Sequence, residues 1–221
     1  MKTQIAVAVS AVFAAVLSPG VQAQTWEPTK NVEFIIPAGT GGGAGLGVEL
    51  FEAPVDGSRA PTLLTPAQEL SRAYPGYAIT SDSTRVVFMA VSPGNRAELF
   101  SVSLSGTEAP VQLSPTLALS NIMDFQLSGD GSRVVYLFGQ YDYALRVFFN
   151  DLVSAPVDGS AAAVRLNDPL PPNGSVLAFQ VSPESSCVSY FADQTSDGAF
   201  ALHRAPIAGG SPLQLTPSDS H

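Results

Sequence analysis

A glycine-centred turn returns about every fifty residues, and this repeat restricts the chain to few folds. Each copy has alternating apolar residues, an Asp-Gly, Ser-Gly or Gly-Gly dipeptide, and a second apolar stretch. The copies are ELFEAPVDGSRAPTLLTP from Glu49, ELFSVSLSGTEAPVQLSP from Glu98, DLVSAPVDGSAAAVRLND from Asp151 and ALHRAPIAGGSPLQLTP from Ala201. The predicted turn glycines are Gly57, Gly106, Gly159 and Gly210, spaced 49, 53 and 51 residues apart. Because such dipeptides favour the positive φ of tight hairpin turns, each copy is predicted to be a β-hairpin.

A second set of stretches alternates with the first. YAITSDSTRVVFMA begins at Tyr77, FQLSGDGSRVVYLF at Phe125 and FQVSPESSCVSYFA at Phe179. Each predicts a strand, a polar turn and a second strand, and Cys187 stands where the first two copies have Arg85 and Arg133. Each repeat therefore predicts a four-stranded antiparallel sheet, which must stack on its neighbours because it cannot bury both faces alone.

A period near fifty residues with four strands is typical of a β-propeller blade. The fold class is therefore all-β, a partial propeller of about three and a half blades. A β-sandwich would not repeat the same turn chemistry. Closed propellers usually have four to eight blades, so we expect a fragment of a larger ring, or copies that associate edge to edge. The predicted segments are a half-blade at 48–66, blades at 77–115, 123–168 and 177–217, and a tail at 218–221.

The residues SGDGSRVVYLF and LVSAPVDGSAAAVRLN resemble the TolB-like, WD-like propeller repeats of exported bacterial proteins. The resemblance covers residues 48–217. It implies a propeller whose loops contact a partner protein. Some propellers instead cap prolyl-oligopeptidase-type peptidases, so the chain is alternatively the non-catalytic propeller part of such an enzyme.

The first 23 residues predict a cleavable signal peptide, with Lys2 before a short apolar run and cleavage after Ala23. The mature protein is therefore expected in the periplasm or outside the cell. Residues 24–47 predict a strand and a glycine-rich linker. TWEPTKNVEFIIPAGTGGGAG resembles the start of tripartite tricarboxylate transporter receptors, periplasmic proteins that bind small carboxylates, with Gly41, Gly42 and Gly43 as the matching loop. The helix of that family does not follow Ala44, which indicates a fusion or a chimaeric junction.

The charge balance limits the choice of partners. The chain has 19 acidic and 10 basic residues, a net charge of −9, and its only lysines are Lys2 and Lys30. Such a chain repels phosphate backbones and has no basic membrane-binding patch, so nucleic-acid binding is not expected. No segment after the first 23 residues is long and apolar enough to cross a membrane, so membrane insertion is not expected either. Cys187 is the only cysteine, so no internal disulfide can form.

The sequence predicts no catalytic, cofactor-binding or metal-binding residues, and we expect the protein not to be an enzyme. Its only histidines are His203 and His221, and it has no Gly-x-Ser-x-Gly motif. The Asp193–Gly198 loop, with two carboxylates, is either a turn or a weak calcium site.

The candidate interaction surface consists of Tyr141, Asp142, Tyr143, Arg85 and Arg133. The two arginines either pair with the turn acids Asp82 and Asp130 or bind carboxylates of a partner. The resulting hypothesis is an exported, non-enzymatic interaction scaffold without cofactors, whose protein partner the sequence does not identify. Its alternatives are the carboxylate receptor and the peptidase propeller.

Overall fold

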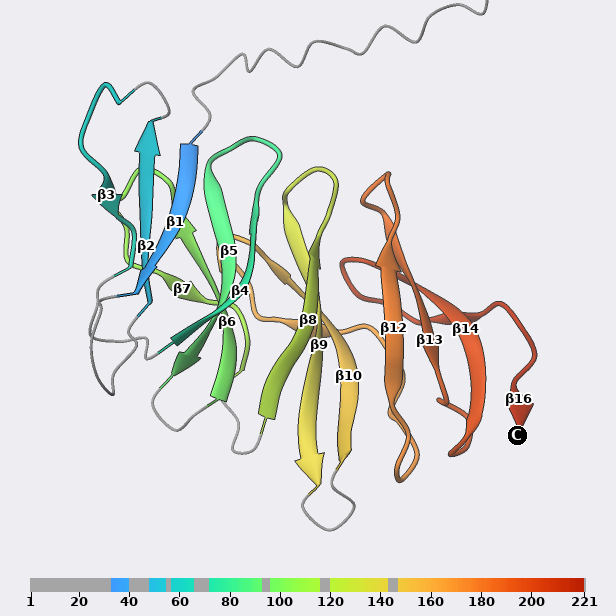
Figure 1. Ribbon diagram of the computed structural model, residues 1–221. Coiled ribbons are helices and arrows are strands. Elements are labelled where there is room, and N and C mark those ends of the chain that lie inside the picture. Colours follow the sequence, from blue (N-terminus) through green and yellow to red (C-terminus); the bar gives the residue numbers. More distant parts are fainter. Residues whose placement is uncertain are drawn as a thin grey trace, which may run out of the picture. The chain divides into compact units, whose positions relative to one another are not determined.

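The computed structural model describes residues 33–39, 48–54, 57–65, 72–92, 96–115, 120–142 and 147–220 (Figure 1). The chain divides into Met1–Asn31 and Val32–His221, and all described residues belong to the second unit. These residues form strands and turns and include no helix, so the predicted all-β class is confirmed. The signal peptide and the glycines Gly41, Gly42 and Gly43 lie outside the described residues.

The described strands form four antiparallel sheets, which we call blades 1 to 4. Each sheet is a meander in which strands adjacent in sequence pair with one another. Blade 1 contains β1 (Glu33–Gly39), β2 (Val48–Pro54) and β3 (Thr62–Leu63). Blade 2 contains β4 (Arg72–Ile79), β5 (Arg85–Ser92), β6 (Arg96–Ser103) and β7 (Val111–Gln112). Blade 3 contains β8 (Ser120–Leu127), β9 (Arg133–Asp142), β10 (Val147–Pro156) and β11 (Val164–Arg165). Blade 4 contains β12 (Val176–Val181), β13 (Cys187–Ala192), β14 (Ala199–Pro206), β15 (Leu213–Gln214) and β16 (Asp219–Ser220), of which β16 pairs with β14.

The glycine turn that leads into the last short strand of the meander (β3, β7, β11 or β15), here called the outer turn, is built in the same way in every blade. The glycine amide donates to the carbonyl three residues earlier, from Gly57 to Pro54 at 3.0 Å and from Gly159 to Pro156 at 3.1 Å. Both glycines have positive φ, +65° and +70°, which explains the choice of residue. In the last copy this place is taken by Gly209, whose amide donates to Pro206, and not by Gly210, so the predicted position is wrong by one residue. The Gly-Gly dipeptide allowed either alignment.

The turn that leads from the first to the second strand of a blade, the inner turn, depends on a hydroxyl group. In blade 3 the Ser128 hydroxyl accepts from the Arg133 amide at 2.9 Å and donates to the Asp130 carboxylate at 2.6 Å. Thr80 makes the same two bonds with Arg85 and Asp82 in blade 2. The polar residues therefore close a hairpin whose flanking strands are apolar.

The outer hairpin of each blade is closed beyond its last short strand (β3, β7, β11 or β15) by one leucine and one polar residue. In blade 3, the Leu166 amide donates to the Leu152 carbonyl at 2.8 Å, and the Leu152 amide donates to Asn167 Oδ1 at 2.7 Å. The same two bonds recur in all four blades. The leucine pairs are Leu50–Leu64, Leu99–Leu113, Leu152–Leu166 and Leu202–Leu215, with Thr65, Ser114, Asn167 and Thr216 as acceptors.

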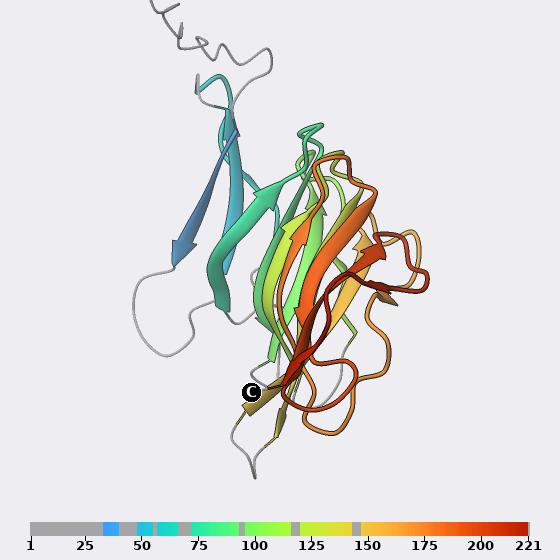
Figure 2. The same ribbon diagram turned by 90° about the vertical axis from the view of Figure 1, so that its right-hand side faces the viewer.

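The core is divided among the three junctions between successive blades. One cluster joins Leu50 and Leu64 of blade 1 to Phe88 and Phe100 of blade 2. Two further clusters join blade 2 to blade 3 and blade 3 to blade 4. Blades 2, 3 and 4 accordingly lie one behind another when the molecule is turned (Figure 2). Stacked meanders of this kind are the architecture of a partial β-propeller, as predicted.

Three strand assignments differ from the predicted segments. Strand β1, placed by the sequence with the N-terminal segment, pairs with β2 from Glu33↔Pro54 to Gly39↔Val48, so blade 1 has three described strands. The free edge of β2 offers unpaired amides and carbonyls, and the extended stretch 33–39 satisfies them. Strand β4 begins at Arg72, and β16 lies in the predicted tail.

Candidate functional site

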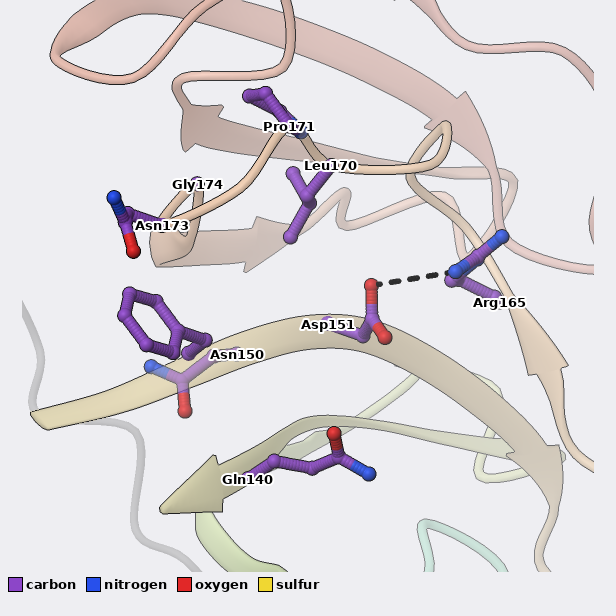
Figure 3. Close-up of a pocket in the computed structure, with 9 residues that line it drawn as sticks. Gln140, Asn150, Asp151, Arg165, Leu170, Pro171, Asn173 and Gly174 are labelled. Atoms are coloured by element: carbon purple, nitrogen blue, oxygen red, sulfur yellow. Dashed lines mark ion pairs between the residues drawn. The ribbon is translucent and has the colours of Figure 1, made fainter. Parts of the chain in front are cut away.

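A polar pocket lies where the chain passes from blade 3 to blade 4. Its volume is about 270 Å³. The lining residues come from the end of β9, the start of β10, the end of β11 and the connection to β12: Gln140, Phe149, Asn150, Asp151, Arg165, Leu170, Pro171, Asn173 and Gly174. Figure 3 shows the connection residues on one side of the pocket, with Asn150, Asp151 and Gln140 on the other.

The connection that forms the upper wall is held by a tight turn. The Gly174 amide donates to the Pro171 carbonyl at 2.9 Å, and Asn173 adopts a φ of +69°, which asparagine tolerates better than most residues. A Cβ added at Gly174 would lie 2.7 Å from Pro171 Cδ, so the turn requires glycine at this position.

Hydrogen bonds fix both ends of this connection. At its start, Asn167 Nδ2 donates to Asp151 Oδ1 at 2.8 Å. At its end, the Ser175 hydroxyl accepts from the Asn150 amide at 3.0 Å, and the Ser175 amide donates to Asp193 Oδ1 at 2.6 Å. The wall is therefore tied to the strands of both blades.

The pocket offers charged groups and side-chain amides, and the amides supply both hydrogen-bond donors and acceptors. The Arg165 guanidinium lies 3.8 Å from the Asp151 carboxylate, with the two side chains 46% and 34% exposed, so both can reach a ligand. The Oδ1 atom of Asn150 is buried and has no hydrogen-bond partner within the described residues. A buried acceptor without a partner is costly, and a ligand N–H group reaches this one only if the pocket wall moves.

The predicted interaction surface is divided between two ends of the blades. Tyr141 lies next to Gln140 at the end of β9, beside the pocket, whereas the Asp142 side chain and Tyr143 lie outside the described residues. Arg133 begins the same strand, eight residues before Tyr141, so the two are about 26 Å apart along an extended chain. Arg85 begins β5 at the corresponding end of blade 2. The structure does not bring the arginines and the tyrosine together.

Both arginines make bonds to the neighbouring strand of their own blade. Arg85 Nε donates to the Ser101 hydroxyl at 2.9 Å, and its guanidinium pairs with Glu108 at 3.2 Å. Arg133 Nε donates to the Ser154 hydroxyl at 2.9 Å, and burial lowers the pKa of Arg133. These guanidinium groups thus hold the second and third strands together.

The remaining candidates for chemistry lie in blade 4. Cys187 is buried, and its pKa is lowered by the Ser182 hydroxyl and further by Arg204. His203 is buried against the Tyr190 ring at 5.2 Å between centroids. Asp193 uses its two oxygens to accept the amides of Ser175 and Gly198. Among the described residues no group of three His, Cys, Asp or Glu side chains could hold a metal ion.

The sequence analysis missed the pocket because its residues belong to no repeated motif. The signal was the stretch NDPLPPNGS, residues 167–175, which departs from the pattern of the other copies and is rich in proline, asparagine and glycine. Such composition marks a structured turn. The pairing of β9 with β10, which brings Gln140 opposite Phe149, was needed to place the other wall.

No protein-family model matches the sequence, and no curated protein sequence matches it. Solved structures do match. Oligogalacturonate lyase from Vibrio parahaemolyticus has a TM-score of 0.52 at 13% identity, over 77% of this chain and 48% of that one. A prolyl endopeptidase has a TM-score of 0.50 at 10% identity, over 78% and 26%. A structure described as TolB from Agrobacterium tumefaciens has a TM-score of 0.47 at 18% identity, over 77% and 55%.

These comparisons agree with the stacked meanders, and the described part of the chain is a β-propeller segment. The predicted propeller fold is confirmed. The chain spans about half the length, or less, of the structures that it matches. A search of the described residues finds no helix long and apolar enough to cross a membrane.

Proposed function

We propose that this propeller segment is an exported interaction module without catalytic activity, and that the pocket between blades 3 and 4 binds an extended segment of a partner protein. The observation that carries the proposal is a pocket of about 270 Å³ that combines side-chain amides, an ion pair and an apolar wall. Asn150 Oδ1 also lacks a partner among the described residues, but it is buried, so a peptide N–H group reaches it only if the pocket wall moves.

The other lining groups fit a peptide as well. A peptide backbone alternates donors and acceptors, and the side-chain amides of Gln140 and Asn173 supply both. Leu170 and Pro171 add an apolar wall, while Asp151 and Arg165 offer charges to a side chain of either sign. Pockets of this composition orient a ligand with a few polar groups and hold it through apolar contact.

Peptide binding is tested by panning a display library of short random peptides on the purified chain. Enriched peptides are then titrated against Gln140→Ala, Asn150→Ala and Arg165→Ala. We expect Kd to rise tenfold or more in each variant, equivalent to about 1.4 kcal/mol or more. Gln214→Ala in β15 is the matched control, because it removes a strand glutamine outside the pocket. Enriched peptides that bind all four variants as tightly as the parent chain would contradict the proposal.

Export and the absence of catalysis are tested separately. Fractionation of a bacterial host followed by N-terminal sequencing should give a mature protein that begins at Gln24. Incubation with peptides and with oligogalacturonates, the substrate classes named for the structural neighbours, should leave both intact by mass spectrometry. Cleavage of either would favour an enzyme. Tight binding of small carboxylates, measured by calorimetry, would favour the receptor alternative.

A further inference from the structure

Each outer turn in the interior of the stack packs against the short strand β3, β7 or β11 of the preceding blade. A Cβ atom added at Gly106 would lie 2.5 Å from Thr62 Cγ2, and one added at Gly159 would lie 2.4 Å from Val111 Cγ1. At Gly209 the contact is looser, 3.5 Å to Val164 Cγ2. One glycine therefore marks each junction between blades.

Blade 4 has the corresponding surface, against which the glycine turn of a following blade would pack, but no described blade covers it. Leu213 pairs with Arg204 as Val164 pairs with Ser154, so Leu213 holds the receiving position, and it is 64% exposed. Leu215 is 47% exposed, whereas its equivalents are buried: Leu64, Leu113 and Leu166 are 3%, 5% and 0% exposed. We call Phe191, Leu202, Leu213 and Leu215 the exit face; Phe191 is 41% exposed.

Blade 1 presents the other side of such a junction, namely the outer turn that would pack against a preceding blade. Gly57 has the φ of the other turn glycines, +65°, yet no described atom lies within 4 Å of a Cβ added there. Phe51 pairs with Ile36 as Phe100 pairs with Phe88, and Phe51 is only half-buried, whereas Phe100 lies in a core cluster. We call Phe51, Ala53 and Gly57 the entry face.

The two faces also match in sequence and charge. The outer turn of blade 1, Ala53–Ser58, has the same six residues as that of blade 3, Ala155–Ser160. The blade 3 turn lies near Arg85 of blade 2, whose charge adds to hydrogen bonds from Ser160 in lowering the pKa of Asp158. Blade 4 presents the exposed Arg204 beside Leu213.

We propose that the exit face of blade 4 binds the entry face of blade 1 in a second copy of this chain, which continues the blade stack from copy to copy. The contact repeats one that the chain already makes three times within itself. Two copies would contribute eight sheets, a number found in closed propellers. Head-to-tail contacts form a ring when the rotation closes and a filament when it does not.

Association between copies of the purified chain is measured by size-exclusion chromatography with light scattering and by sedimentation velocity. We expect a species of two copies at micromolar concentration. Leu213→Glu on the exit face and Gly57→Asn on the entry face should each raise the dissociation constant at least tenfold. Asparagine accepts positive φ and finds open space within its own chain, so Gly57→Asn should fold normally.

Gly198→Asn is the matched control, because Gly198 also has positive φ, +75°, and open space around its Cβ position. This variant should associate like the parent chain. Circular dichroism of all three variants checks that they are folded, so that lost association reports the contact and not unfolding.

An equimolar mixture of Leu213→Glu and Gly57→Asn distinguishes head-to-tail packing from a contact between like faces. Each mixed pair retains one intact junction, so the mixture should associate more strongly than either variant alone. A parent chain that stays monomeric at about 100 μM would overturn the proposal and favour a further blade of a longer chain as the occupant. Association that both variants leave unchanged would overturn it as well.

Discussion

Replacing a turn glycine by alanine in blade 3 should destabilise the fold more than the same change in blade 1. Gly159 and Gly57 lie in identical six-residue turns with φ values of +70° and +65°. They differ in their surroundings. A Cβ at position 159 would lie 2.4 Å from Val111 Cγ1, while a Cβ at position 57 would meet no described atom within 4 Å. The pair of variants therefore isolates the contact between blades.

The expected magnitudes follow from two costs. Alanine in a left-handed conformation costs about 1–2 kcal/mol, and both variants carry this cost. Gly159→Ala also forces a methyl group into the packed junction with blade 2, which costs about 1–3 kcal/mol more. The free energies of unfolding of the two variants should therefore differ by about 1–3 kcal/mol. For a chain of this size, each kcal/mol lowers Tm by roughly 2–4 °C.

The assay is urea unfolding followed by far-ultraviolet circular dichroism. All variants are made in the Leu213→Glu background, so that contacts between copies do not contribute. Gly106→Ala should resemble Gly159→Ala, because its Cβ would lie 2.5 Å from Thr62 Cγ2. Equal destabilisation by Gly57→Ala and Gly159→Ala would refute the reasoning, since the turn alone would then account for the glycine.

Three further variants test buried and turn groups. Tyr136→Phe removes the bond from the tyrosine hydroxyl of blade 3 to the Leu113 carbonyl of blade 2, 3.1 Å long, and should lower the free energy of unfolding by about 1 kcal/mol in urea titrations. Asp130→Asn should destabilise the fold at neutral pH and progressively less toward about pH 3 in thermal melts. The Ser128 hydroxyl bond lowers the pKa of Asp130 below 3.8, so the carboxylate stabilises above that pH and loses its effect as the pH falls. Burial lowers the pKa of His203 below 6.5, so the unfolded chain gains a proton first and stability should fall as the pH drops below about 6.5; His203→Gln should flatten that slope, and an unchanged slope would contradict the assignment.

Sequence reasoning succeeded where one residue type has one physical role. The turn glycine can be recognised because a tight turn accepts few alternatives to it. It stands before an apolar strand, and a polar residue that closes the hairpin, such as Thr65 or Asn167, follows that strand. Four such copies were enough to predict the propeller. The predicted turn glycine was wrong only in blade 4, where Gly209 and not Gly210 makes the turn bond, because two adjacent glycines satisfy the same requirement.

The candidate site was harder to predict because it depends on where strands end relative to one another. Gln140 and Arg165 are separated by 25 positions in the sequence, and pairing through β10 places both at the pocket. The aromatic residues near Tyr141 lie at the same end of blade 3 as the pocket. Nothing in the sequence around Asn150 indicated that its side-chain oxygen would be left without a hydrogen-bond partner among the described residues.

The replacement of Arg85 and Arg133 by Cys187 shows what the repeat preserves. In blades 2 and 3 the arginine lies on the second strand and donates to a serine on the third, Ser101 or Ser154. In blade 4 the third strand carries the arginine instead: Arg204, whose guanidinium helps to lower the pKa of Cys187 on the second strand. By register, Arg204 occupies the place of Ser101 and Ser154. An arginine on this pair of strands is thus present in blades 2, 3 and 4, although in blade 4 it comes from the third strand and not from the second. A motif residue that one repeat lacks should therefore be sought on the paired strand.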